Sequence, residues 1–251
     1  MKRKRGLLLA GFCLILTAMG GGIFREGTRM AMAAAMAATA LPVSGRVILV
    51  DAGHGGSDPG KTGSLQDEKD INLQIAGYLQ SYLEMGGASV IITRLEDEML
   101  SEGGSVTKKG DMRQRGELIR QSHPDLVVSI HQNSYPGSSC WGPQVFYWQN
   151  SAEGKRAAEQ VQKQLNIFTG GTRSDKANGE YYILRQSEDT AILVECGFLT
   201  NPEEEKKLND PAYQKRIAWS IYAGINRYFE EEENEDTVGS DGGSRGSTLR
   251  I

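Results

Sequence analysis

Residues 46–60 constrain the fold of this chain more than any other stretch. They open with four consecutive aliphatic residues, 47–50, and an apolar run without alternation is typical of a strand buried on both faces. The run ends abruptly in Asp51 and a glycine-rich loop around His54. Glycines on both sides of His54 let the backbone turn tightly and leave the imidazole uncovered. A histidine at the carboxyl end of a buried strand stands where open α/β sheets bind their ligands.

Strand and helix patterns alternate through the rest of the chain. Apolar runs predict strands, and apolar residues that recur every three or four positions predict helices. The expected strands are residues 47–51, 88–93, 126–130, 145–148, 181–184 and 191–195, and the expected helices are residues 68–83, 111–121 with Asp111 as N-cap, 151–165, 202–208 and a last helix from Pro211. Residues 168–179 are expected to be a polar loop. This alternation predicts an α/β domain with a largely parallel central sheet flanked by helices.

Three of the predicted buried strands end in residues of types that commonly bind metals in proteins. These side chains are His54, His131 and Glu195, and Glu68 follows the loop of His54. If the three strands are parallel neighbours, all four side chains reach one edge of the sheet. Two histidines and one carboxylate are the protein ligands of a common catalytic zinc site, and a second carboxylate then serves as general base. Sequence position leaves open which of Glu68 and Glu195 is the ligand and which is the base.

Simpler interpretations exist for each of these residues. His131 is also explained by a hydrogen-bonded turn, and Glu195 by a salt bridge or a helix cap at a strand end. Asp67 and Asp70 lie close enough to Glu68 to compete with it as the ligand. Spacing alone therefore gives a weak signal for a metal site.

The first forty residues differ from the remainder. Basic residues 2–5 precede an uncharged stretch of nineteen residues, 6–24, which is the pattern of a secretory signal. The stretch is long enough for a spanning helix, although three consecutive glycines weaken it. An Ala-x-Ala site at residues 38–40 favours cleavage, and retention as an N-terminal membrane anchor is the alternative. In either case the protein is expected to be exported.

Charge narrows the classes of partner. The first 41 residues carry six basic and one acidic side chain, so the rest of this chain of net charge −4 carries −9. An acidic domain argues against nucleic acid as a partner, and membrane association is expected only through the N-terminal segment. The pattern of the three cysteines does not resemble a disulfide framework or a cysteine-based metal site, and at most one disulfide is expected in the exported part. Residues 230–251 are acidic and then rich in glycine and serine, so we expect a disordered tail.

Four motifs in this order resemble the zinc-dependent N-acetylmuramoyl-L-alanine amidases of the Amidase_3 type. They are VDAGHGGSDPG at residues 50–60, EKDINL at 68–73, SIHQNS at 129–134 and VECGFLTN at 194–201. The resemblance spans residues 45–229, which we take as the catalytic domain. The basic leader, the short layout and an Arg-Gln-Arg at 113–115 are most similar to the sporulation and germination amidases of that family.

The resemblance implies a role for each candidate residue. One Zn²⁺ would be held by His54, Glu68 and His131, with Glu195 as the catalytic carboxylate. The implied substrate is peptidoglycan or a muropeptide, cut between the lactyl group of N-acetylmuramic acid and L-alanine. In the sporulation branch this cut precedes formation of muramic-δ-lactam in the spore cortex. The sequence leaves open whether the enzyme acts alone or together with an accessory protein.

Some candidates and alternatives stand outside the family pattern. Arg185 and Asn133 are candidates for contact with the substrate or with the developing oxyanion, and a solvated loop charge is the simpler interpretation of Arg185. Gln132 follows His131 where the family commonly has a small apolar residue, so it is a candidate determinant of substrate preference. The competing functions are a zinc peptidase that cuts within the stem peptide and a non-catalytic protein of the cell wall or spore.

Overall fold

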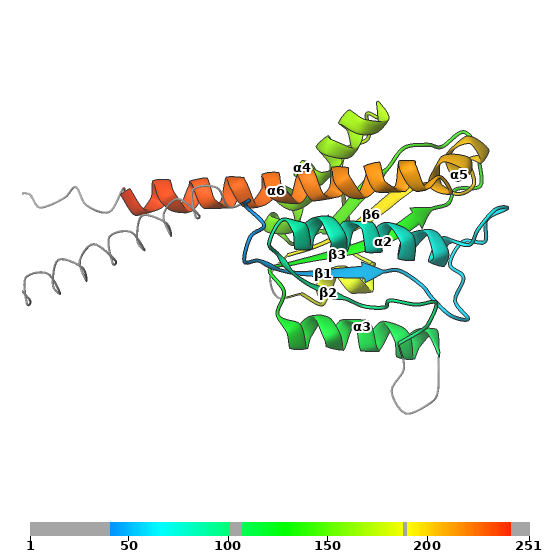
Figure 1. Cartoon of the computed structure of the whole chain (residues 1–251), viewed down its shortest axis with the longest axis horizontal. Coiled ribbons are helices and arrows are strands. Elements are labelled where there is room, and N and C mark those ends of the chain that lie inside the picture. The colour runs from blue at the N-terminus through cyan, green and yellow to red at the C-terminus, as the bar shows by residue number, and fades with distance from the viewer. Residues whose placement is uncertain (1–40, 101–106, 188–189, 242–251) are drawn as a thin grey trace, which may run out of the picture. The chain divides into compact units, whose positions relative to one another are not determined.

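The computed structural model describes residues 41–100, 107–187 and 190–241. These residues form a six-stranded sheet with helices on both faces (Figure 1). The strands are β1 (Val47–Ala52), β2 (Ser89–Ile92), β3 (Leu126–Asn133), β4 (Gln144–Trp148), β5 (Lys176–Asn178) and β6 (Ala191–Phe198). The helices are α2 (Glu68–Met85), α3 (Lys108–Ser122), α4 (Ala152–Thr169), the 3-10 helix η1 (Tyr182–Arg185), α5 (Pro202–Leu208) and α6 (Pro211–Asp241).

The sheet order is β2-β1-β3-β6-β4-β5. All neighbouring strands run parallel except β4 and β6, which are antiparallel. The three strands that were expected to end in functional side chains, β1, β3 and β6, are therefore adjacent and parallel. The predicted α/β fold with a largely parallel sheet is confirmed.

Alternation along β1 explains how the sheet is covered on both faces. Ile48, Val50 and Ala52 pack into the larger core, which α2, α4 and α6 complete. Leu49 points to the opposite face and packs into a smaller core with residues of α3 and η1. Figure 1 shows α2, α4 and α6 over one face and α3 over the other. Asp51 shares the face of Leu49, so its carboxylate is directed toward α3.

Three predicted local features are wrong. Residues 182–185 form the helix η1 and not a strand, because the Asn178 side chain accepts hydrogen bonds from the backbone N–H groups of Glu180 and Tyr181 and turns the chain. The supposed loop 168–179 contains the end of α4 and the short strand β5. Helix α3 is capped by Thr107 and not by Asp111, which is buried and paired with Arg115.

The last helix also differs from expectation. The chain was expected to be disordered from Glu230, but α6 continues through Asp241. Glutamate is a good helix former, and two of the acidic residues form ion pairs with the domain. Glu232 lies 2.7 Å from Arg46, and Glu235 lies 3.0 Å from Arg156. Residues 242–251, which are the remainder of the expected tail, lie outside the described residues. The same is true of residues 1–40, which hold the expected signal or anchor segment.

Candidate metal centre and active site

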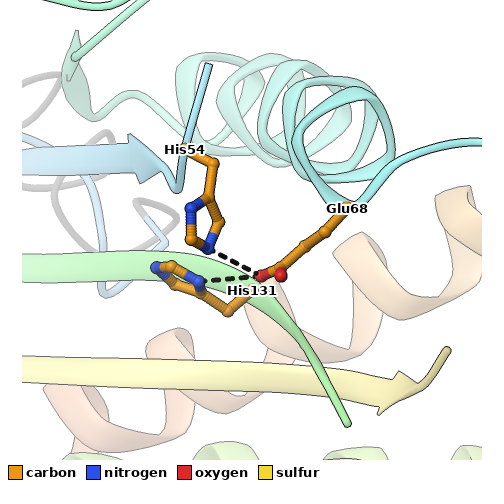
Figure 2. Close-up of side chains that lie close together, drawn as sticks. All are labelled: His54, Glu68 and His131. Carbon is orange, nitrogen blue, oxygen red and sulfur yellow. Dashed lines mark hydrogen bonds and ion pairs between the residues drawn. The ribbon is translucent and has the colours of Figure 1, made fainter. Parts of the chain in front are cut away.

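Three side chains from separate elements converge at the carboxyl edge of the sheet (Figure 2). His54 follows β1, Glu68 opens α2 and His131 lies near the end of β3. Glu68 Oε1 lies 2.9 Å from His131 Nδ1 and 3.3 Å from His54 Nε2. One potential ligand atom from each residue falls within 4.8 Å of the other two. Among the described residues this is the one cluster with the composition of a metal site.

His54 reaches the cluster from a strained backbone. Its φ is 62°, in the left-handed region that non-glycine residues seldom adopt. Two buried arginines hold this turn through its carbonyl oxygens. Arg115 donates to the carbonyls of Ala52 (2.8 Å) and His54 (2.7 Å), and Arg94 donates to those of Ala52 (3.0 Å) and Gly53 (3.1 Å). The strain is thus held in place by the surrounding structure.

Glu68 is positioned by its place at the start of a helix. The positive end of the helix dipole favours an ionised carboxylate there. Backbone N–H groups of Lys61 (2.8 Å) and Gln132 (3.1 Å) donate to its two oxygens. Burial raises the pKa of Glu68, but the hydrogen bonds and charges of His131 and His54 outweigh it and hold the pKa well below its usual range. The structure brings Glu68 to the histidines, and it does not bring Asp67 or Asp70 into the cluster.

His131 depends on a glycine for its space. A Cβ atom on Gly53 would overlap the imidazole of His131, so no larger residue fits at that position without moving the ring. The same register of the sheet pairs His131 with Glu195 on the neighbouring strand β6. The positions of His131 and Glu195 are therefore set by the pairing of β3 with β6 and not by the loops.

Glu195 lies in the cavity but outside the ligand cluster. It is 8% exposed, and its Oε2 is buried without a hydrogen-bond partner among the described residues. Burial raises its pKa; His131 and His54 lower it and Glu68 raises it further, with a net value of about 7. A buried carboxylate with a free oxygen and a pKa near neutrality has the properties of a general base.

His54 has a second partner on the side away from Glu68. Its Nδ1 lies 2.9 Å from Asp58 Oδ2, and Lys108 pairs with the other oxygen of Asp58 at 2.5 Å. Burial lowers the pKa of His54, but the hydrogen bonds and charges of Glu68 and Asp58 outweigh it and raise the pKa to about 9. A carboxylate on the far nitrogen of a metal-binding histidine orients the ring toward the metal.

The cluster opens into a cavity of about 410 Å³ between α3 and η1. His54, Glu68, His131, Glu195 and Asn133 all line it. Arg185 does not line it, and its guanidinium instead lies 5.7 Å from the ring centre of Tyr182. Gln132 also lines the cavity, but its side chain is 3% exposed and donates to Asn72 (3.1 Å).

Several residues of the site were not predicted to belong to it, and one of them, Asp111, was expected only as a helix N-cap. Asp58, Arg94, Asp111 and Tyr181 contact the cavity or the His54 turn, and Arg115 was noted only as part of a family motif. Asp58 belongs to the loop motif that already suggested a site, so its position carried a signal. Asp111 and Arg115 are four residues apart on a predicted helix, which is the spacing of an ion pair, but no pattern indicated that the pair is buried.

Comparisons with known proteins agree with this geometry. The family model Amidase_3, described as N-acetylmuramoyl-L-alanine amidase, matches residues 48–227. A germination-specific N-acetylmuramoyl-L-alanine amidase of Bacillus subtilis (strain 168) is 40% identical over 197 residues, which are 76% of this chain and 83% of the relative.

Solved structures give the same result. The CwlD amidase of Clostridioides difficile, solved in complex with the GerS lipoprotein, is similar with a TM-score of 0.71 and 35% identity over 74% of this chain and 99% of that chain. An N-acetylmuramoyl-L-alanine amidase of Clostridium difficile 630 is similar with a TM-score of 0.67 and 31% identity over 74% of this chain and 98% of that chain.

Proposed function

The chain belongs to the Amidase_3 family of N-acetylmuramoyl-L-alanine amidases, and we propose that it is a zinc enzyme of spore cortex maturation. As a member of this family it hydrolyses the amide bond between N-acetylmuramic acid and L-alanine in peptidoglycan, and it acts outside the cytoplasm. The finer proposal has three parts: the metal and its ligands, the catalytic carboxylate, and the role in the spore.

His54, Glu68 and His131 would hold a single Zn²⁺. The donor set fits this ion, since two imidazoles and one carboxylate that converge from three elements are a common catalytic zinc arrangement with one position left for water. When bound, zinc lowers the pKa of a coordinated water and polarises the carbonyl under attack. Asp58 would keep the His54 ring in the orientation that directs Nε2 toward the metal.

Glu195 would be the general base and then the general acid. The observation that carries this assignment is its buried Oε2, which has no partner among the described residues in a cavity shared with the three ligands. The carboxylate takes a proton from the attacking water as the new C–O bond forms. It then delivers that proton to the nitrogen of L-alanine as the C–N bond breaks. In the metal-free protein, burial raises the pKa of this carboxyl to about 7.

The role in the spore is supported by the relatives. One is named as germination-specific, and the C. difficile CwlD amidase was solved with a lipoprotein partner. We propose that this chain removes stem peptides in the forespore intermembrane space before muramic-δ-lactam forms, with the N-terminal segment as export signal or anchor. An accessory lipoprotein is part of this proposal. No helix among the described residues is long and apolar enough to cross a membrane.

Two measurements test the proposal. Mass spectrometry of digested peptidoglycan should find intact stem peptides with a free L-alanine amine, whereas cuts within the stem peptide would indicate a peptidase. Spores of a strain that lacks the gene should contain cortex without muramic-δ-lactam, and the wild-type gene should restore it. Normal lactam content in those spores would refute the role in the cortex while leaving the amidase activity intact.

A further inference from the structure

We propose that the Tyr181 hydroxyl is a catalytic hydrogen-bond donor that contacts the carbonyl oxygen of the scissile amide. This inference rests on the proposed function, because it concerns the same bond and the same cavity. When water attacks the amide carbon, the carbonyl π electrons move onto oxygen, which becomes an oxyanion. A donor already aimed at that oxygen stabilises the transition state more than the substrate, and so raises kcat.

The described lining of the cavity contains no free cation for this task. Apart from the two histidines of the cluster, Arg115 is its one basic residue. The Arg115 guanidinium is 1% exposed and fully occupied, since it pairs with Asp51 and Asp111 and donates to two backbone carbonyls. Arg185, the cation considered from the sequence, lies outside the lining. A side chain of the described lining that donates to this oxygen beside the metal would therefore have to be a neutral group.

Tyr181 is held rigidly at the wall of the cavity. Its backbone N–H donates to Asn178 Oδ1 (2.7 Å), and the residue is the N-cap of η1. Its ring stands edge-on to Phe146 on β4, with the ring centres 5.4 Å apart. Phe146 in turn pairs with Leu193 on β6, two residues before Glu195. The phenol is thus fixed relative to the strand that carries the proposed base, at little further cost in conformational entropy.

The hydroxyl of Tyr181 is available and protonated. It has no hydrogen-bond partner among the described residues. Burial raises its pKa, the carboxylates of Glu195 and Glu68 raise it further, and the result is a pKa of about 12. Tyr181, Glu68 and Glu195 line the same cavity. A phenol that keeps its proton at neutral pH acts as a donor and not as a base.

The neighbouring tyrosine provides a matched comparison. Tyr182 also lines the cavity, but its hydroxyl is turned toward α3. It lies against Gly116 of that helix. Tyr182 therefore has the same side chain and lines the same cavity, but its hydroxyl is packed against α3. Asn133 and Ser134 also line the cavity with neutral donor groups, and the Asn133 Oδ1 accepts from the Ser134 N–H (2.8 Å), which leaves its Nδ2 as the donor.

The test compares Tyr181→Phe, Tyr182→Phe and Asn133→Ala with the wild-type enzyme on one defined muropeptide. Tyr181→Phe keeps the ring, so metal content and thermal unfolding should match the wild type. Its kcat should fall about 100-fold with KM within about twofold, as for loss of one oxyanion donor. Tyr182→Phe removes a hydroxyl that is packed against α3, so its kcat should fall far less than that of Tyr181→Phe.

Binding provides a second readout that does not depend on turnover. A phosphinate that replaces the scissile amide mimics the tetrahedral oxyanion. Calorimetry should show that Tyr181→Phe weakens its binding by about the same factor as kcat/KM, while affinity for the released stem peptide stays unchanged. If folded, metal-loaded Tyr181→Phe protein has the same kcat and the same phosphinate affinity as the wild type, the assignment is overturned, whatever the result for Asn133→Ala. An inactive wild-type enzyme would instead remove the proposed function, and this inference with it.

Discussion

At the scale of single residues, the site depends on charges buried beneath it. Arg115 and Asp51 are 1% and 2% exposed, and they lie 2.5 Å apart directly under the turn that carries His54. Burial opposes ionisation of Asp51, but Arg115 and the Ser129 hydroxyl outweigh it and keep the pKa of this carboxyl below its usual value. The pair is thus ionised, and it orients backbone carbonyls that a neutral core could not orient.

Removal of Arg115 should be costly for this reason. Arg115→Met would leave Asp51 and Asp111 buried without their partner, and we expect a loss of about 3–5 kcal/mol in the free energy of unfolding. Arg113→Met is the control, because Arg113 is exposed one half-turn away, and its effect should stay within about 0.5 kcal/mol. Urea unfolding of both variants measures the difference. Equal stabilities would show that the buried network does not hold the turn.

The raised pKa of Glu195 makes a prediction about stability and pH. The carboxyl has a pKa of about 7 in the fold against 4.5 in the unfolded chain, so the fold favours the protonated form. Its stabilising contribution is complete below pH 4.5 and is lost as the pH rises through 7. In metal-free protein, Glu195→Gln should therefore gain about 3 kcal/mol over the wild type between pH 4.5 and pH 8. A difference independent of pH would contradict the assigned pKa.

At the scale of elements, the order of the strands in the sheet places most of the candidate site residues. The adjacency of β1, β3 and β6 brings His54, His131 and Glu195 to one edge. This arrangement could be anticipated from the sequence, because apolar runs identify buried strands and parallel strands share a carboxyl edge. The positions of Arg94 and Tyr181 could not be anticipated, since they depend on loop paths and on a 3-10 turn set by the Asn178 side chain, whereas Asp58 belongs to the loop motif that already suggested a site.

The close approach of β1 to His131 gives a prediction at this scale. Gly53→Ala would push a methyl group into the His131 ring, so we expect zinc affinity to fall roughly 10–100-fold. Gly77→Ala is the matched control, because Gly77 lies inside α2 with open space around it. That change should stabilise the protein by about 0.5–1 kcal/mol and leave zinc affinity unchanged. Competition titration with a chelator distinguishes the two results.

At the scale of the whole molecule, the described part of the chain ends in the long helix α6. The family match ends at residue 227, yet α6 continues to Asp241 and pairs Glu232 and Glu235 with the domain. Composition alone predicted disorder there, because acidic and glycine-rich segments usually lack a packed face. The helix persists past Phe229 because it extends an existing one, so no new nucleation is needed.

The boundary at Phe229 can be tested directly. A chain that ends at residue 229 should lose about 1–2 kcal/mol of stability relative to one that ends at residue 241, since it lacks the two partly exposed ion pairs with Arg46 and Arg156 and the pair within α6 between Arg227 and Glu230. Its kcat should be unchanged, because none of the described residues after 229 lines the cavity. Thermal unfolding and turnover of the two chains check both statements. A large loss of activity in the shorter chain would mean that the catalytic domain extends beyond Phe229.

The central claim is that His54, Glu68 and His131 hold one zinc ion while Glu195 moves the proton. The measurement that tests it most directly is the zinc content and the product masses of wild-type and Glu195→Gln protein, prepared in parallel. We expect one zinc per chain in both, release of stem peptides with a free L-alanine amine by the wild type, and no release by the variant. A variant that still cleaves, or that has lost its zinc, would contradict the division between ligands and base.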